Sequence, residues 1–78
     1  MRITVKLYAT LRQYQPDVPR AGLLLDVPAG STIGEVLPRF GLPDDVPLVA
    51  MVNDSVEQLD HILTEGDTLS LFPPIAGG

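Results

Sequence analysis

The residues that could do chemistry in this 78-residue chain are its last seven, where an aromatic residue and two prolines precede a pair of glycines. Pro73 and Pro74 lack a backbone N–H, so they should end strand pairing and keep the following segment extended and stiff. Gly77 and Gly78 have no side chain, so the terminal carboxylate, ionised near neutral pH with a pKa of about 3.5, is the widest group at the tip. Such a tail is suited to delivering a carboxylate into a narrow pocket of another protein.

A frayed chain end is the alternative explanation, because termini are frequently disordered and glycine is common in them. The stiff, apolar Phe72-Pro73-Pro74 neck favours the functional interpretation, since a frayed end needs no such neck. We therefore expect one folded domain over residues 1–72 and an extended, flexible tail over residues 73–78.

Other catalytic chemistry has few candidates in this sequence. There is no cysteine, so a disulfide framework and a thiol nucleophile are both excluded. His61 is the single histidine and has only Asp60 beside it, whereas a metal site needs several ligands at suitable spacing. No glycine-rich phosphate loop follows a predicted strand. We expect the chain to bind no metal and no ATP by itself, and not to be an enzyme on its own.

The net charge of −5 is unevenly distributed along the chain. Residues 1–39 contain five basic and three acidic residues, whereas residues 40–78 contain seven acidic residues and no lysine or arginine. Nucleic acid is excluded as a partner, since phosphate binding needs a basic stripe. The acidic half favours a basic protein partner, although it could serve solubility alone. No apolar run approaches the ~20 residues of a membrane span and the start is no secretory signal, so we expect a cytoplasmic protein without a membrane partner.

The first half of the domain is predicted to begin with two strands. Strict apolar alternation over residues 2–8 indicates a half-buried strand, and residues 9–12 continue the same phase but can already bend away. Prolines and a glycine mark residues 13–22 as a loop. Residues 23–27 form the second strand, in which the first, third and fifth residues share a face. The two strands should pair as a hairpin.

A short helix is predicted over residues 32–40. Thr32, with a glutamate three residues later, has the spacing of a capping box, and apolar residues then follow at helical intervals. Pro38 removes a helical hydrogen bond, so the helix should kink there or change to a looser last turn. Gly41 is suited to a C-cap, and Pro43 prevents continuation.

Three more strands are expected, over residues 46–53, 56–59 and 68–72. Apolar residues on both faces of the first of these indicate that it is covered on both sides or meets a partner. Phe72 has the outward phase of the last strand, which makes it a candidate docking anchor; packing against the returning tail is the alternative. The order of elements predicts a two-layer α+β domain with a mixed sheet, the first and last strands side by side at its centre.

Four sequence motifs can be compared with those of known proteins. They are the Thr32–Glu35 helix start, the Val52-Asn53 strand end, the Leu63-x-x-Gly66-Asp67 turn and the Phe72-Pro73-Pro74-x-Ala76-Gly77-Gly78 tail. Together with the predicted strand order they resemble the ubiquitin-like sulfur carriers of the MoaD and ThiS type. The Phe-Pro-Pro neck favours the branch of the molybdopterin synthase small subunits over the thiamine branch. The resemblance covers nearly the whole chain and implies a β-grasp fold, with one main helix packed on one face of the sheet.

The resemblance also implies a reaction. An E1-like adenylating enzyme would use ATP and Mg²⁺ to activate the carboxylate of Gly78, and sulfur would then displace AMP to leave a thiocarboxylate. Phe72 would dock on the partner, and the tail would insert into the large subunit of molybdopterin synthase through Pro73, Pro74, Ile75, Ala76 and Gly77. The sulfur would pass to the pyranopterin precursor of a molybdenum or tungsten cofactor. A carrier for thiamine or tRNA thiolation, or a ubiquitin-like protein modifier or interaction module, remain the alternatives.

Overall fold

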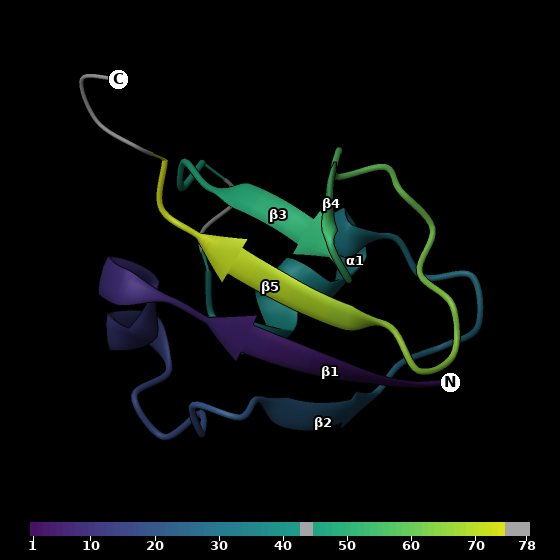
Figure 1. Cartoon of the computed structure of the whole chain (residues 1–78), viewed down its shortest axis with the longest axis horizontal. Coiled ribbons are helices and arrows are strands. Elements are labelled where there is room, and N and C mark those ends of the chain that lie inside the picture. Colours follow the sequence, from purple (N-terminus) through teal and green to yellow (C-terminus); the bar gives the residue numbers. More distant parts are fainter. Residues whose placement is uncertain (43–44, 75–78) are drawn as a thin grey trace.

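The fold is built on a five-stranded mixed sheet with strand order β2-β1-β5-β3-β4 (Figure 1). The computed structural model describes residues 1–42 and 45–74. The strands are β1 (Arg2–Leu7), β2 (Leu23–Asp26), β3 (Val49–Val52), β4 (Ser55–Glu57) and β5 (Thr68–Phe72). β1 and β5 run parallel in the middle of the sheet, while all other neighbours are antiparallel. The predicted hairpin and the predicted central pairing of the first and last strands are both confirmed.

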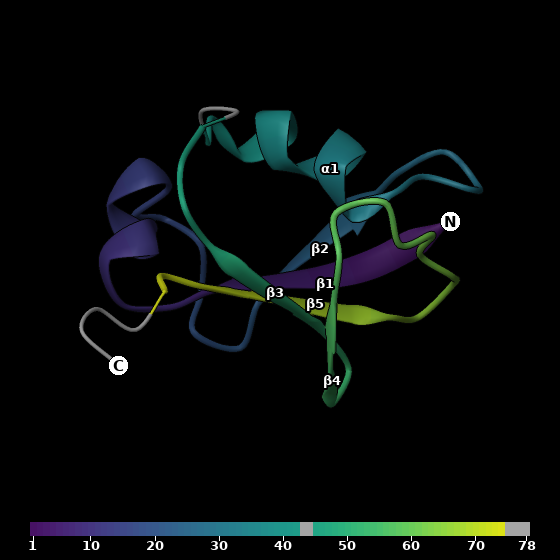
Figure 2. The ribbon, with the colours of Figure 1, turned by 90° about the horizontal axis from the view of Figure 1, so that it is seen from above.

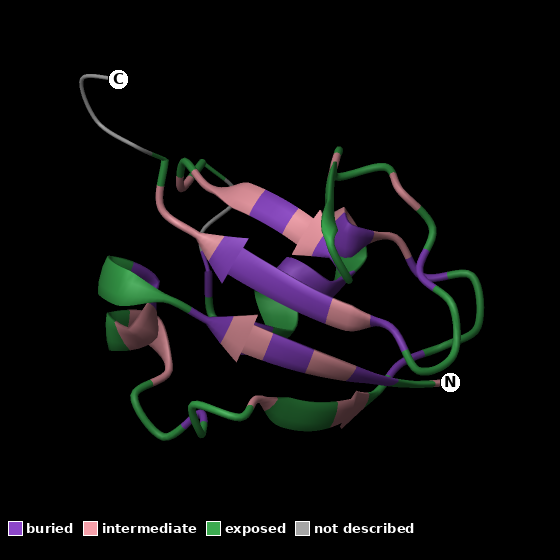
Figure 3. Cartoon of the chain, in the orientation of Figure 1, coloured by how far each residue is buried: buried purple, intermediate pink, exposed green. Residues whose placement is uncertain are grey.

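One face of the sheet packs beneath a short helix, α1 (Ile33–Val36), and the 3₁₀ helix η2 (Leu37–Phe40) (Figure 2). The alternating apolar residues of β1 and β5 point to this side and are almost completely buried (Figure 3); they are Ile3, Val5, Leu7, Leu69 and Leu71. Within the described residues, no helix covers the opposite face of the sheet. The result is the predicted two-layer α+β arrangement, with one face of the sheet open.

The predicted capping box at the start of α1 is confirmed. The Glu35 N–H donates to Thr32 Oγ1 at 3.3 Å, and the Thr32 N–H donates to Glu35 Oε1 at 2.9 Å. The α-helix ends after one turn and continues as η2, because Pro38 offers no N–H to an α-helical bond. Gly41 forms the C-cap with a left-handed φ of 72°. Pro43 lies outside the described residues.

The segment after β1 differs from the prediction. A 3₁₀ helix, η1 (Ala9–Tyr14), begins where only a bend and a loop were expected. Leu11 is buried, which anchors the helix to the core. The Arg12 guanidinium donates to the carbonyl oxygens of Leu7 at 3.2 Å and of Val18 at 2.7 Å. These two side-chain hydrogen bonds, which span five and six positions, hold the turn, and sequence periodicity does not reveal them.

The strand ends also differ from those expected. β3 begins at Val49, three residues later than predicted, and β4 begins one residue earlier than predicted, at Ser55. Leu23 was expected to share a buried face with Leu25 and Val27, yet 39% of its surface is exposed. This follows from the sheet order, since β2 is an edge strand and the helical layer lies behind the middle of the sheet, not behind β2 (Figure 1).

Asp67 joins the start of β5 to the turn between β3 and β4. Its buried carboxylate accepts hydrogen bonds from the Thr64 N–H at 2.8 Å and from Asn53 Nδ2 at 3.2 Å. Asn53 Oδ1 in turn accepts from the Thr68 N–H at 3.1 Å. Burial raises the pKa of Asp67, but the hydrogen bonds from Thr64 and Asn53 outweigh it, so the pKa lies below its ordinary value.

Acid should therefore weaken the fold through Asp67. Because its pKa is lower in the folded than in the unfolded chain, its contribution is present above the ordinary carboxyl pKa of about 4 and is lost as the pH falls through the lower, folded value. In urea unfolding repeated from about pH 7 to about pH 2.5, Asp67→Asn should be less stable at neutral pH. It should also lose less stability on acidification than the parent. An identical pH slope in both proteins would contradict this role.

Candidate functional site

The predicted tail begins at the end of β5. Phe72 is the last residue of this strand, Pro73 is half-buried and Pro74 is exposed. The remaining predicted tail residues lie outside the described residues; they are Ile75, Ala76, Gly77 and Gly78. Their roles in carrying and inserting the carboxylate stay predictions, and the described site is the surface from which this segment starts.

Phe72 stacks on Tyr8 at the tail's origin. β1 and β5 pair in parallel, with Leu7 beside Leu71. Tyr8 and Phe72, the residues that follow these two, therefore lie side by side on the open face. The ring centroids lie 4.4 Å apart with planes 12° from parallel. The Tyr8 N–H donates to the Leu71 carbonyl at 3.0 Å, which fixes the backbone of the pair. Phe72 thus faces outward, as the alternation along the last strand predicts.

An apolar hollow adjoins this stack. It has a volume of about 360 Å³ and is lined by Ala9, Val49, Met51, Phe72 and Pro73. We call these residues, together with Tyr8, the tail-root surface. The helical layer covers only the other face of β3, so Val49 and Met51 stay half-buried on the open face. This hollow is therefore a candidate contact surface beside the start of the tail.

A polar groove continues from the tail-root surface along the open face. It has a volume of about 460 Å³, and its polar lining residues are Lys6, Asn53, Asp54, Thr68 and Ser70. Tyr8, Met51 and Phe72 line it too, so the hollow and the groove share two residues, Met51 and Phe72. A partner seated on this face would meet apolar contacts beside the tail and hydrogen-bonding groups farther along the sheet.

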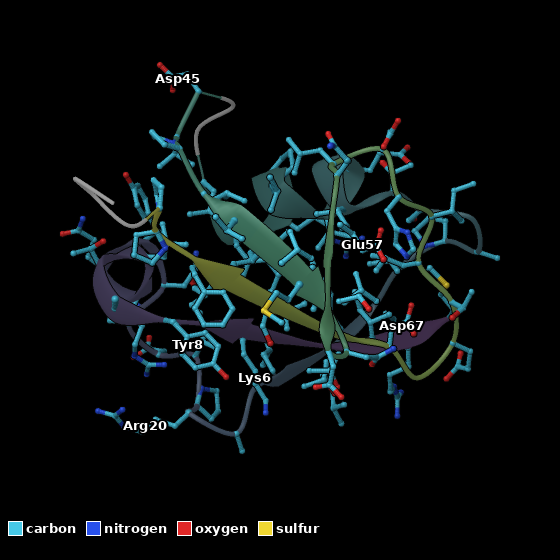
Figure 4. The ribbon with its side chains drawn as sticks, turned by 45° about the horizontal axis from the view of Figure 1, so that its top comes forward. Lys6, Tyr8, Arg20, Asp45, Glu57 and Asp67 are labelled. Carbon is cyan, nitrogen blue, oxygen red and sulfur yellow. The ribbon has the colours of Figure 1, made fainter. Side chains whose placement is uncertain are left out.

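The charge around the tail is mixed, which the two halves of the sequence do not predict. Lys6 lies beside Tyr8 in the groove, and Arg12 and Arg20 line a small hollow on the other side of Tyr8 (Figure 4). Asp54 lines the groove as well. The sheet places basic β1 directly against β5, so residues distant in sequence share one surface. This face is therefore not uniformly acidic, and the basic partner stays a prediction.

Tyr8 belongs to the site, although no sequence pattern indicated that it would lie there. Its outward phase was clear, but its stack with Phe72 depends on the parallel register of β1 and β5, which no local pattern specifies. Lys6 joins the site through the same register, and Met51 joins it through the antiparallel pairing of β3 with β5. His61 lies away from this surface: its Nδ1 is 3.4 Å from Glu57 Oε1, and it lines neither the hollow nor the groove.

Two features are absent from the part of the chain that the structure describes. Across residues 1–42 and 45–74, no group of three or more His, Cys, Asp or Glu residues gathers as a cation site. Over the same residues, no helix has the length and apolar character needed to cross a membrane.

A match to a protein family shows to which proteins this chain is related. Residues 5–78 match the model of the ThiS family, from β1 through the whole tail. The chain belongs to the ThiS family. Among curated relatives, the molybdopterin synthase sulfur carrier subunit of Escherichia coli is 46% identical over 35 residues. That alignment covers 45% of this chain and 43% of the E. coli protein, so it spans less than half of either.

Solved structures place this ThiS-family chain in the ubiquitin-like β-grasp fold, which confirms the prediction. SAMP1 from Haloferax volcanii is 25% identical with a TM-score of 0.71, and each chain is covered fully. A putative molybdopterin converting factor subunit 1 from Pyrococcus furiosus is 19% identical with a TM-score of 0.75, covering 96% of this chain and 99% of that one. A chain from the complex of molybdopterin-converting factor subunits 1 and 2 of Helicobacter pylori is 21% identical, with a TM-score of 0.60 and full coverage of both.

Proposed function

We propose that this ThiS-family chain is a sulfur carrier that donates sulfur from a thiocarboxylate on Gly78 to the pyranopterin precursor of molybdopterin. The observation that carries the proposal is the family match over residues 5–78, which extends through the Gly-Gly tail. The tail-root surface adds to it, because an exposed aromatic stack lies where the tail starts. Its position suits a surface on which a partner enzyme holds the carrier.

The chemistry divides between the carrier and its partners. A carboxylate accepts nucleophiles poorly, so an E1-like adenylating enzyme would react Gly78 with ATP, in the presence of Mg²⁺, to give the acyl-adenylate and release pyrophosphate. A sulfur nucleophile at the oxidation level of hydrosulfide would then attack the acyl carbon and release AMP. Gly77 and Gly78 would let that carbon reach a buried active site without steric conflict. The carrier supplies the reacting carboxyl group, and its partners supply the catalytic groups.

The proposed acceptor follows from the relatives. The E. coli protein with the 46% identical stretch is a molybdopterin synthase sulfur carrier subunit. The H. pylori neighbour was solved as a complex of subunits 1 and 2 of its molybdopterin-converting factor. We therefore assign this chain a large-subunit partner of the molybdopterin synthase type, into which residues 73–78 insert. Thiamine and thiolated tRNA remain the alternative acceptors.

Intact-mass spectrometry tests the loading step. The chain is incubated with its adenylating enzyme, ATP, Mg²⁺ and a sulfide source. We expect the mass gain that replaces one oxygen by sulfur, localised to the last residues by fragmentation. A chain without Gly77 and Gly78, and a reaction without ATP, are the controls and should gain nothing. Unloaded protein in the complete reaction, with an intact tail and an enzyme that is active on another carrier, would contradict the proposal.

A protein modifier is the second candidate, because the Haloferax volcanii neighbours include small archaeal modifier protein 1 at 24% identity and a TM-score of 0.74. In that case, Gly78 would form an isopeptide bond with lysines of target proteins. Conjugates of higher mass that disappear when Gly77 and Gly78 are deleted would favour this function. Co-purification with a molybdopterin synthase large subunit, without such conjugates, would favour the sulfur carrier.

A further inference from the structure

We infer that β2 is a self-association edge, through which two copies of this chain pair antiparallel and join their sheets into one. The inference concerns a surface outside the tail-root surface and goes beyond the proposed function. It begins from the sequence of β2, in which Leu23, Leu24 and Leu25 follow one another on an edge strand. Leu24 exposes 62% of its surface and Leu23 exposes 39%.

The free edge of β2 has hydrogen-bonding groups that point away from β1. Met1 and Val27 form a hydrogen-bonded pair. The Met1 amino group donates to the Val27 carbonyl at 2.7 Å, and the Val27 N–H donates to the Met1 carbonyl at 2.9 Å. In an antiparallel pair, residues alternate between those bonded to the neighbour and those turned away. Leu25 and Leu23 therefore bond to β1, while Leu24 and Asp26 present their N–H and C=O groups outward.

Edge strands of monomeric proteins are commonly protected by a lysine, a proline or a bulge. β2 contains none of these within Leu23–Asp26. Its single charged side chain, Asp26, already forms an ion pair with Arg2, at 3.1 Å from Nε to Oδ1. Because β2 is apolar and its one acid is ion-paired, it can add a second copy of itself without placing unpaired like charges together.

The register of the pairing follows from these outward groups. With Leu24 opposite Leu24 of the second copy, each N–H donates to the other's carbonyl, and the two exposed leucine side chains lie together on the open face. Asp26 then lies opposite Gly22 of the second copy, where no side chain obstructs it. Exposed Arg20, two residues before that glycine, comes to the same end of the strand as the acid. This arrangement offers charge complementarity between Arg20 and Asp26 of different copies.

Charge also favours β2 over β4, the other edge of the sheet. Seven acidic residues fall in residues 40–78, and Glu57 lies within β4, with Asp54 in the turn that precedes it. Pairing β4 with itself would bring these acids together, whereas pairing through β2 keeps the two acidic edges at opposite ends of the joined sheet. β1 and β5 separate β2 from most of the tail-root surface, so each copy would keep its own tail available.

Sedimentation equilibrium from about 20 μM to about 1 mM tests the pairing, because so small a contact implies weak affinity. We expect the mass to rise with concentration from 8.4 kDa towards twice that value. Leu24→Lys should associate at least about tenfold more weakly than the parent, so its mass should stay close to that of the monomer over this range. Val56→Lys, at an equally exposed apolar position on β4, is the matched control and should associate like the parent. A mass that stays at 8.4 kDa up to the highest concentration would overturn the inference.

Amide hydrogen exchange on the unmodified chain gives a second measurement that does not depend on a variant folding. Protection of the Leu24 and Asp26 amides should increase with protein concentration, while that of the Val56 amide stays constant. Concentration-independent exchange at Leu24, alongside a rising mass, would assign the contact to another surface and would also overturn the inference.

Discussion

A variant with one alanine added after Gly78 should acquire no sulfur while folding like the parent. The proposed reaction needs the terminal carboxyl carbon at one point in the adenylating site, and the added residue moves the carboxylate by about 3.5 Å. Misplacement by about 1 Å can cost a reaction roughly 100-fold. We therefore expect under ~1% of the parent's loading in an intact-mass assay. Urea unfolding should be unchanged, because the core lies within residues 3–71.

The variant Gly78→Ala separates the length of the tail from its width. It keeps the carboxylate at its original distance from Phe72 but adds a methyl group at the tip. We expect it to load more sulfur than the extended chain and less than the parent. Normal loading of the extended chain would refute delivery of the carboxylate to a fixed point, whatever the outcome for Gly78→Ala.

Much of the fold could be predicted because its signals are local. Alternation along β1 specified its buried residues, and Thr32 with Glu35 specified the start of α1. In β5 the alternation identified the two buried leucines, but Ser70, which points to the open face, is buried as well. Pro38 predicted a kink or a looser last turn, and the structure has a 3₁₀ turn there. In each case, a backbone or burial requirement is satisfied by residues only a few positions apart.

What could not be predicted depends on contacts between distant segments. The stack of Tyr8 on Phe72 joins residues from opposite ends of the chain and exists only because β1 and β5 are parallel neighbours. The helix η1 is a separate case, because the hydrogen bond from Arg12 to the carbonyl of Val18 spans only six positions but depends on the path of a segment that was expected to be a loop. The mixed charge beside the tail arises in the same way as the stack, since the sheet brings Lys6 next to Phe72. The tail itself was identified from its composition, and its role stays a prediction.

Phe72→Ala should weaken binding of the adenylating enzyme by about 30-fold or more, the range of an interface hot spot. The loss of folding stability should be smaller, about 1–2 kcal/mol, because the ring is half-buried and its stack on Tyr8 contributes about 0.5–1.5 kcal/mol. Isothermal titration calorimetry with the enzyme and urea unfolding of the carrier measure the two losses. Tyr8→Ala should reduce binding in the same direction, since Tyr8 holds the ring of Phe72 on the open face.

Two controls separate docking from packing. Ile62→Ala removes an exposed apolar side chain, 59% exposed, that does not line the hollow or the groove, and it should bind the enzyme like the parent. Tyr8→Phe keeps the stacked ring and should retain most of the affinity. In the Tyr8→Ala, Phe72→Ala double variant, the binding loss should be less than the sum of the two single losses, because each ring positions the other. If Phe72→Ala instead lowers binding and folding stability by equal free energies, the ring is a packing residue, and the tail-root surface is not where the partner docks.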